Sequence, residues 1–117
     1  MEETWFTGIA DELARCLTDA ETCAEACEKL LESMRGDAGD DARRIVHTLV
    51  APAAIARVLI ELIDQPPQLV LAACRLFQDS ARDAIADLEA LRVEASTVVA
   101  ALRASADSCG RLLDVAS

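Results

Sequence analysis

The sequence predicts an all-α protein, an antiparallel up-down four-helix bundle made by a single domain over residues 1–117. Apolar residues recur in alternating steps of three and four along most of the chain, which is the pattern of helices with one buried face. Two clear breaks interrupt it, at the glycine- and aspartate-rich stretch 36–40 and at the two prolines 66–67. Strict period-two alternation is not found, so no sheet is expected. With 53% hydrophobic residues in 117, the chain can bury one core.

The first two helices are expected at 3–35 and 41–64. The first carries the most regular inward stripe: Phe6, Ile9, Leu13, Cys16, Ala20, Cys23, Cys27, Leu30 and Met34. The second has its stripe at Ile45, Leu49, Pro52, Ala56, Leu59 and Ile63. Because Pro52 lies deep inside this helix, it should kink the helix or remove a backbone hydrogen bond.

The third and fourth helices are expected at 67–91 and 95–115. Pro67 suits the first turn of the third helix. No glycine or proline marks the end of that helix, and a turn near 92–96 is predicted because four helices of comparable length close a bundle. The alternative is one continuous helix that a partner chain would have to cover. The stripe of the fourth helix is Ala95, Val99, Leu102, Ala106, Cys109, Leu113 and Ala116.

Composition excludes several classes of function. A net charge of -10 argues against a nucleic-acid partner and an anionic membrane surface. The most apolar window, 45–63, contains a proline and charged side chains, so we expect no membrane helix. The N-terminus has no secretory pattern, and five cysteines are an odd number, which together favour reduced thiols in the cytoplasm. Without a Glu-x-x-His motif or a glycine-rich phosphate loop, we expect no enzyme.

The cysteines are the candidate metal ligands. Cys23 and Cys27 are one turn apart on the face that also carries Cys16. Antiparallel helices joined by short loops should bring Cys16, Cys74 and Cys109 within about one turn of a common layer, with Cys23 and Cys27 at another level. Thiolates are soft ligands for Cu(I) and Zn(II), and a structural zinc site wants four ligands where this layer offers three. We rank Cys23 and Cys27 first as ligands, then Cys16, with Cys74 and Cys109 completing a site.

Part of the chain resembles a known family. The run Asp-Ala-Glu-Thr-Cys-Ala-Glu-Ala-Cys-Glu-Lys at 19–29 is similar to the cysteine-dense first helix of the four-helix-bundle copper-storage proteins. The segments Ala-Arg-Val-Leu at 56–59 and Leu-Ala-Ala-Cys-Arg at 71–75 resemble the middle of that family. The resemblance implies Cu(I) bound in the core by cysteines from all four helices. Here the second helix has none and the third and fourth keep one each, so we expect a divergent member of low capacity.

Two alternative functions remain open. The first is a non-catalytic structural or partner-binding bundle, in which the cysteines pack as small hydrophobes. The second rests on His47, because the run 42–49 resembles the helix of histidine phosphotransfer domains and places this side chain on the polar face. That family has a lysine and a glycine three and four residues after its histidine, where this chain has Val50 and Ala51. Val50, Ala54 and Val58 leave room for a homo-oligomer contact beside the polar face.

Overall fold

The computed structural model describes residues 2–37, 39–91 and 96–116, with side chains from Ile9 onward. In this part of the chain all regular structure is helical. The helices are α1 (Glu2–Ser33), α2 (Asp40–Glu61), α3 (Pro67–Leu91) and α4 (Ser96–Ala116). The predicted four-helix bundle is therefore confirmed, with helix ends within three residues of those expected from the sequence.

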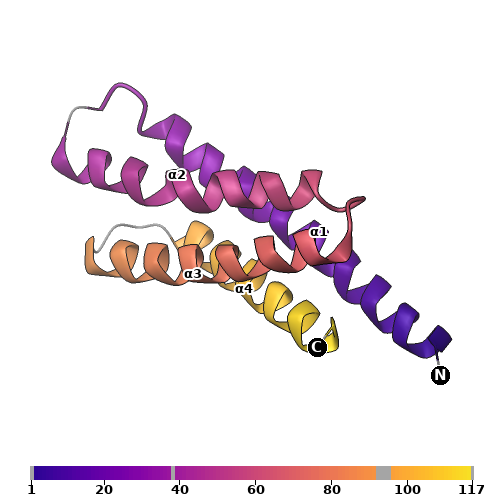
Figure 1. Ribbon diagram of the computed structural model, residues 1–117. Helices are drawn as coiled ribbons and strands as arrows, with labels where there is room; N and C mark the ends of the chain where they lie inside the picture. The colour runs from indigo at the N-terminus through magenta and orange to yellow at the C-terminus, as the bar shows by residue number, and fades with distance from the viewer. Residues whose placement is uncertain (1, 38, 92–95, 117) are drawn as a thin grey trace.

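The four helices close into an elongated bundle of 55 × 23 × 18 Å. Each helix packs against its neighbours in chain order, and α4 returns to pack against α1 (Figure 1). The N-terminal end of α1 extends past the connection between α2 and α3 (Figure 1). None of the described helices combines the length and the apolar character that crossing a membrane requires.

The connection between α3 and α4 decides between the two alternatives for the second half of the chain. The predicted turn falls on residues 92–95, which lie outside the described residues. The helices on either side of it lie next to each other, since the Gln78 side-chain amide of α3 donates to the Ala106 carbonyl of α4 at 3.2 Å. One continuous helix cannot fold back in this way, so that alternative is wrong.

Helix α2 ends at Glu61, three residues before the expected end. The Leu62 amide donates to the carbonyls of Val58 and Leu59 at 2.9 and 3.2 Å, so the last turn tightens toward 3₁₀ geometry. Pro66 disfavours helical backbone at Gln65 just before it, so the helix does not continue up to the prolines. Pro52 is buried inside α2, and the helix continues through it.

The core is made largely of small side chains. Alanines and cysteines fill the helix–helix contacts, with a few larger residues between them, of which Phe77, Leu49, Leu88, Leu102 and Leu112 are the largest that are fully buried. The inward stripe predicted for α2 is buried as expected apart from its last position, and the buried residues of α3 follow the same spacing of three and four. In α4 the buried face is turned by about one residue: Val98, Ala101, Ser105, Ser108 and Leu112 are buried in place of Val99, Ala106 and Leu113.

Candidate metal site

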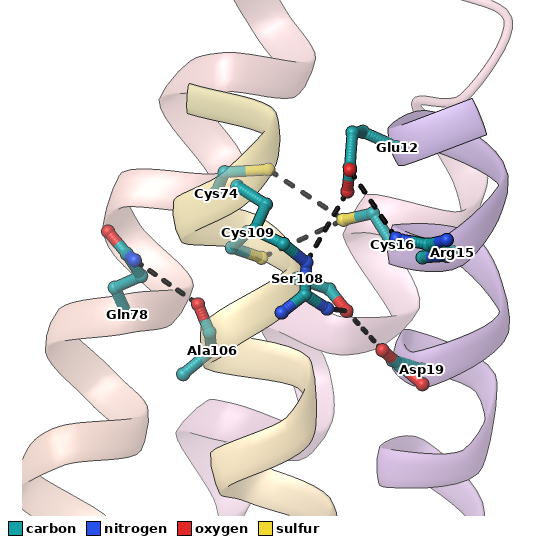
Figure 2. A network of polar contacts seen from close by, with 10 residues as sticks. Glu12, Arg15, Cys16, Asp19, Cys74, Gln78, Ala106, Ser108 and Cys109 are labelled. Carbon is teal, nitrogen blue, oxygen red and sulfur yellow. Dashed lines mark hydrogen bonds and ion pairs between the residues drawn. The ribbon is translucent and has the colours of Figure 1, made fainter. Parts of the chain in front are cut away.

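Three cysteines from three helices meet in the core. The Sγ atom of Cys16 in α1 lies 3.9 Å from that of Cys74 in α3 and 3.8 Å from that of Cys109 in α4 (Figure 2). All three sulfur atoms lie within 4.8 Å of one another, and all three residues are buried. We call Cys16, Cys74 and Cys109 the thiol triad. The common layer predicted from helix lengths and loop positions is confirmed.

The size of the thiol triad suits a metal ion. For a triangle with these edges, the centre lies about 2.2–2.5 Å from each corner. Zinc–thiolate bonds are about 2.3 Å long, so an ion at the centre could bond all three sulfurs without backbone movement. Among the described residues no further His, Cys, Asp or Glu joins this group. The residues present therefore fit a soft, three-coordinate ion better than a four-coordinate structural zinc.

The three thiols do not ionise alike. Hydrogen bonds from Cys109 and Cys74 lower the pKa of Cys16 to about 4, against burial and the nearby Asp19 carboxylate, which both act to raise it. The Cys109 thiol lowers the pKa of Cys74, but its contact with Cys16 and its burial outweigh this and raise the value to about 12. Contacts with Cys16 and Cys74, together with burial, raise the pKa of Cys109. Cys16 is therefore the first of the three to become a thiolate, stabilised by two S–H donors.

A polar network joins α1 and α4 beside the thiol triad. The buried Ser108 hydroxyl donates to the Asp19 carboxylate, and it accepts from Arg111 Nη2 at 3.1 Å (Figure 2). Arg111 Nε lies 3.4 Å from a Glu12 carboxylate oxygen, and Arg15 lies 3.5 Å from the other oxygen of Glu12. The network thus contains two carboxylates, Glu12 and Asp19, and two guanidinium groups, Arg15 and Arg111. The network holds the two helices that carry Cys16 and Cys109, and it leaves no unpaired cation of its own beside the sulfur atoms.

Two buried serines of α4 give a matched test of this network. Ser108 is hydrogen-bonded, whereas the Ser105 hydroxyl, equally buried three residues earlier, has no partner among the described residues. Ser108→Ala should lower the free energy of unfolding in urea by about 1–3 kcal/mol, because it leaves the Asp19 carboxylate without its donor. Ser105→Ala should be neutral or stabilising, because it removes an unsatisfied buried hydroxyl. Equal losses in the two variants would contradict this account of the network.

The other two cysteines lie at a separate level of the core. Cys23 and Cys27 in α1, which we call the cysteine pair, are both fully buried. Their thiols interact, which raises the pKa of Cys23 and lowers that of Cys27, while burial acts to raise both. Neither belongs to the group formed by the thiol triad. The structure thus divides the five candidate ligands into three and two, and the predicted ranking of the pair above the triad stays a prediction.

His47 lies on the surface, as its helical phase predicted. It lines a shallow cavity of about 340 Å³ between α2 and α3, together with Arg43, Arg44, Thr48, Asp87, Ala90 and Leu91. On the same helix Val50 and Val58 are about half exposed, so the apolar positions predicted beside the polar face are open to contact. Neither feature touches the thiol triad or the cysteine pair.

The fold and the site together define the class of protein. It is a four-helix bundle whose core brings thiols from three helices close enough together that they could hold a metal ion. The model of the family described as copper storage protein matches residues 9–114, so the chain belongs to this family. Comparisons with curated proteins and with solved structures give no match.

Proposed function

We propose that this protein binds a small number of Cu(I) ions through its core cysteines. The observation that carries the proposal is the thiol triad, three buried sulfur atoms at 3.8 and 3.9 Å around a centre at metal–thiolate distance. The family to which the chain belongs agrees with this chemistry. Soft thiolate ligands select Cu(I) over the harder divalent ions. The triad holds one such ion, and the cysteine pair supplies a second, two-coordinate site.

The charges of the site suit a monovalent ion. Cys16 forms a thiolate first, and one thiolate balances the single positive charge of Cu(I). The other two sulfurs become ligands only as they lose their protons, because the thiolate is the form that binds a metal. A buried ion that stayed unbalanced would be costly, since desolvation penalties reach several kcal/mol per ion.

The reason to expect a lower capacity than in a bulk copper-storage protein lies in α2. The buried residues of this helix are Ala42, Ile45, Leu49, Pro52, Ala53, Ala56 and Leu59, so one side of the core offers no sulfur. Five thiols at two levels hold a few ions. A protein of this kind would buffer or sense Cu(I), with no catalytic role, in a reducing compartment such as the cytoplasm that keeps the thiols reduced.

A titration with Cu(I) tests the proposal. The reduced protein competes for Cu(I) with a chromophoric chelator of known affinity, in the absence of oxygen. We expect stoichiometric uptake by the unmodified protein, loss of the triad component when Cys16, Cys74 and Cys109 are all replaced by alanine, and retention of that component when only Cys23 and Cys27 are replaced. A protein that takes no Cu(I) from the chelator would refute the proposal and favour a bundle whose cysteines serve packing.

A further inference from the structure

The thiol triad has a second property, which concerns ions of higher charge. Three thiolates around Cu(I) carry a net charge of minus two, and around a divalent ion minus one, but around a trivalent ion the complex is neutral. A neutral complex matters here because the three cysteines are at most 2% exposed. Unbalanced charge in such a place is strongly disfavoured.

Among the described residues, the surroundings of the thiol triad offer little positive charge to balance a trithiolate anion. Arg111, a cation of the polar network, is already engaged with Glu12 and Ser108. Arg75 on α3 is exposed and acts on Cys74 only weakly, as the last of the influences on its pKa. Asp19 adds negative charge near Cys16. A complex that uses all three thiolates is therefore favoured only if the central atom carries three positive charges.

The number of sulfur ligands also favours a trivalent central atom. The triad offers three sulfurs and no fourth donor among the described residues, and the buried residues of α2 are all apolar. Trivalent arsenic forms three bonds to sulfur in a pyramid, and its lone pair needs no ligand on the open side. Sulfur is its preferred donor, as for the other soft ions that thiolates bind.

We propose that the thiol triad binds trivalent arsenic, supplied as arsenite, in a neutral complex with Cys16, Cys74 and Cys109. This inference rests on the proposed function, in that it assigns a second cargo to the same soft-ligand site. One As(OH)3 reacts with three thiols to give As(SR)3 and three waters. Three As–O bonds and three S–H bonds break while three As–S and three O–H bonds form. No electrons are transferred, and the arsenic stays trivalent.

The cysteine pair provides the control for this reaction. Cys23 and Cys27 are as deeply buried as the thiol triad, but they offer only two sulfurs, so an arsenic bound there keeps one hydroxyl group. The variant Cys23→Ala/Cys27→Ala removes two thiols and keeps the triad. The variants Cys74→Ala and Cys109→Ala each remove one thiol and break the triad. Each variant is also titrated with Cu(I), so that the two cargoes are compared on the same samples.

The experiment loads arsenite during refolding of the reduced protein from urea, so that burial of the thiols does not block entry. Native mass spectrometry and the arsenic–thiolate absorbance in the ultraviolet then report the product. We expect the product with one arsenic and loss of three protons, at one per chain, both in the unmodified protein and in Cys23→Ala/Cys27→Ala. In Cys74→Ala and Cys109→Ala the three-proton product should be absent and the remaining affinity at least tenfold weaker.

Three results would overturn the inference. The first is arsenic bound equally well by the triad variants, and the second is loss of binding when only the cysteine pair is removed. The third is failure of arsenite to bind a protein that still takes up Cu(I) through the triad, which would leave the proposed function intact. If neither arsenite nor Cu(I) binds, both the inference and the proposed function are wrong.

Discussion

Replacing Cys16 with alanine is expected to abolish tight Cu(I) binding at the thiol triad. The Cys16 sulfur lies 3.9 Å from that of Cys74 and 3.8 Å from that of Cys109. It is also the first of the three thiols to ionise, since its pKa is lowered to about 4. Loss of groups that only support a metal's ligands weakens binding ~10–100-fold, and loss of a ligand should cost at least as much. A competition titration with a Cu(I) chelator should therefore show the triad affinity reduced by about a hundredfold or more.

Cys23→Ala is the matched control for this substitution. It lies two turns further along the same helix, is also buried, and changes the same atoms. It should leave the triad affinity unchanged and weaken only the component due to the cysteine pair. Urea unfolding of both variants separates a loss of ligand from a loss of fold. If Cys16→Ala keeps the triad affinity, or if Cys23→Ala lowers it as much, the assignment of the site is wrong.

Replacing Phe77 with alanine is expected to be the most destabilising single change in α3. Phe77 is the largest of the fully buried side chains and lies one turn after Cys74 on the same face. In a core built mainly of alanine and cysteine, little neighbouring volume can collapse into the space it leaves. Phenylalanine-to-alanine changes in cores cost about 3–5 kcal/mol, and whole domains are stable by about 5–15 kcal/mol. The midpoint of urea unfolding should fall accordingly.

The neighbouring Leu76 provides the comparison. It is 57% exposed, so Leu76→Ala removes a side chain that is mostly in water already. Its effect on the free energy of unfolding should stay within about 0.5 kcal/mol. A large loss in Leu76→Ala would mean that this surface is covered in solution, for example by a second copy of the chain. A small loss in Phe77→Ala would contradict the packing described for the core.

The sequence was sufficient to predict the bundle and the common layer of Cys16, Cys74 and Cys109. Both follow from helix geometry, because helices rise by a constant amount per residue and short loops make neighbouring helices antiparallel. Two visible breaks, at 36–40 and at the prolines 66–67, mark the end of the first helix, both ends of the second and the start of the third. The resemblance of the 19–29 run to the first helix of copper-storage proteins also agrees with the family model that matches the chain.

The phase of α4 could not be predicted because its buried face carries hydroxyl groups. A pattern based on hydrophobicity passes over Ser105 and Ser108 and predicts Ala106 on the buried face instead. Ser108 is buried because its hydroxyl is hydrogen-bonded to both Asp19 and Arg111. Asp19 lies 89 residues before it, and Arg111 lies three residues after it. A contact between two helices so distant in sequence leaves no periodic signal. The polar network beside the triad was missed for the same reason.

On the proposed function, the division of the cysteines into two levels should set how the protein responds to a rising metal concentration. Cys16 and Cys23 are seven residues apart, which is ~10 Å along the helix axis, whereas a metal–thiolate bond is about 2.3 Å long. No ion can therefore bridge the thiol triad and the cysteine pair, and filling one level contributes no bond to the other. Occupancy should follow the sum of two independent saturation curves, without the steep, cooperative rise of a single shared cluster. On the proposed function, metal uptake should therefore rise gradually over a wide range of concentration, with two separate midpoints.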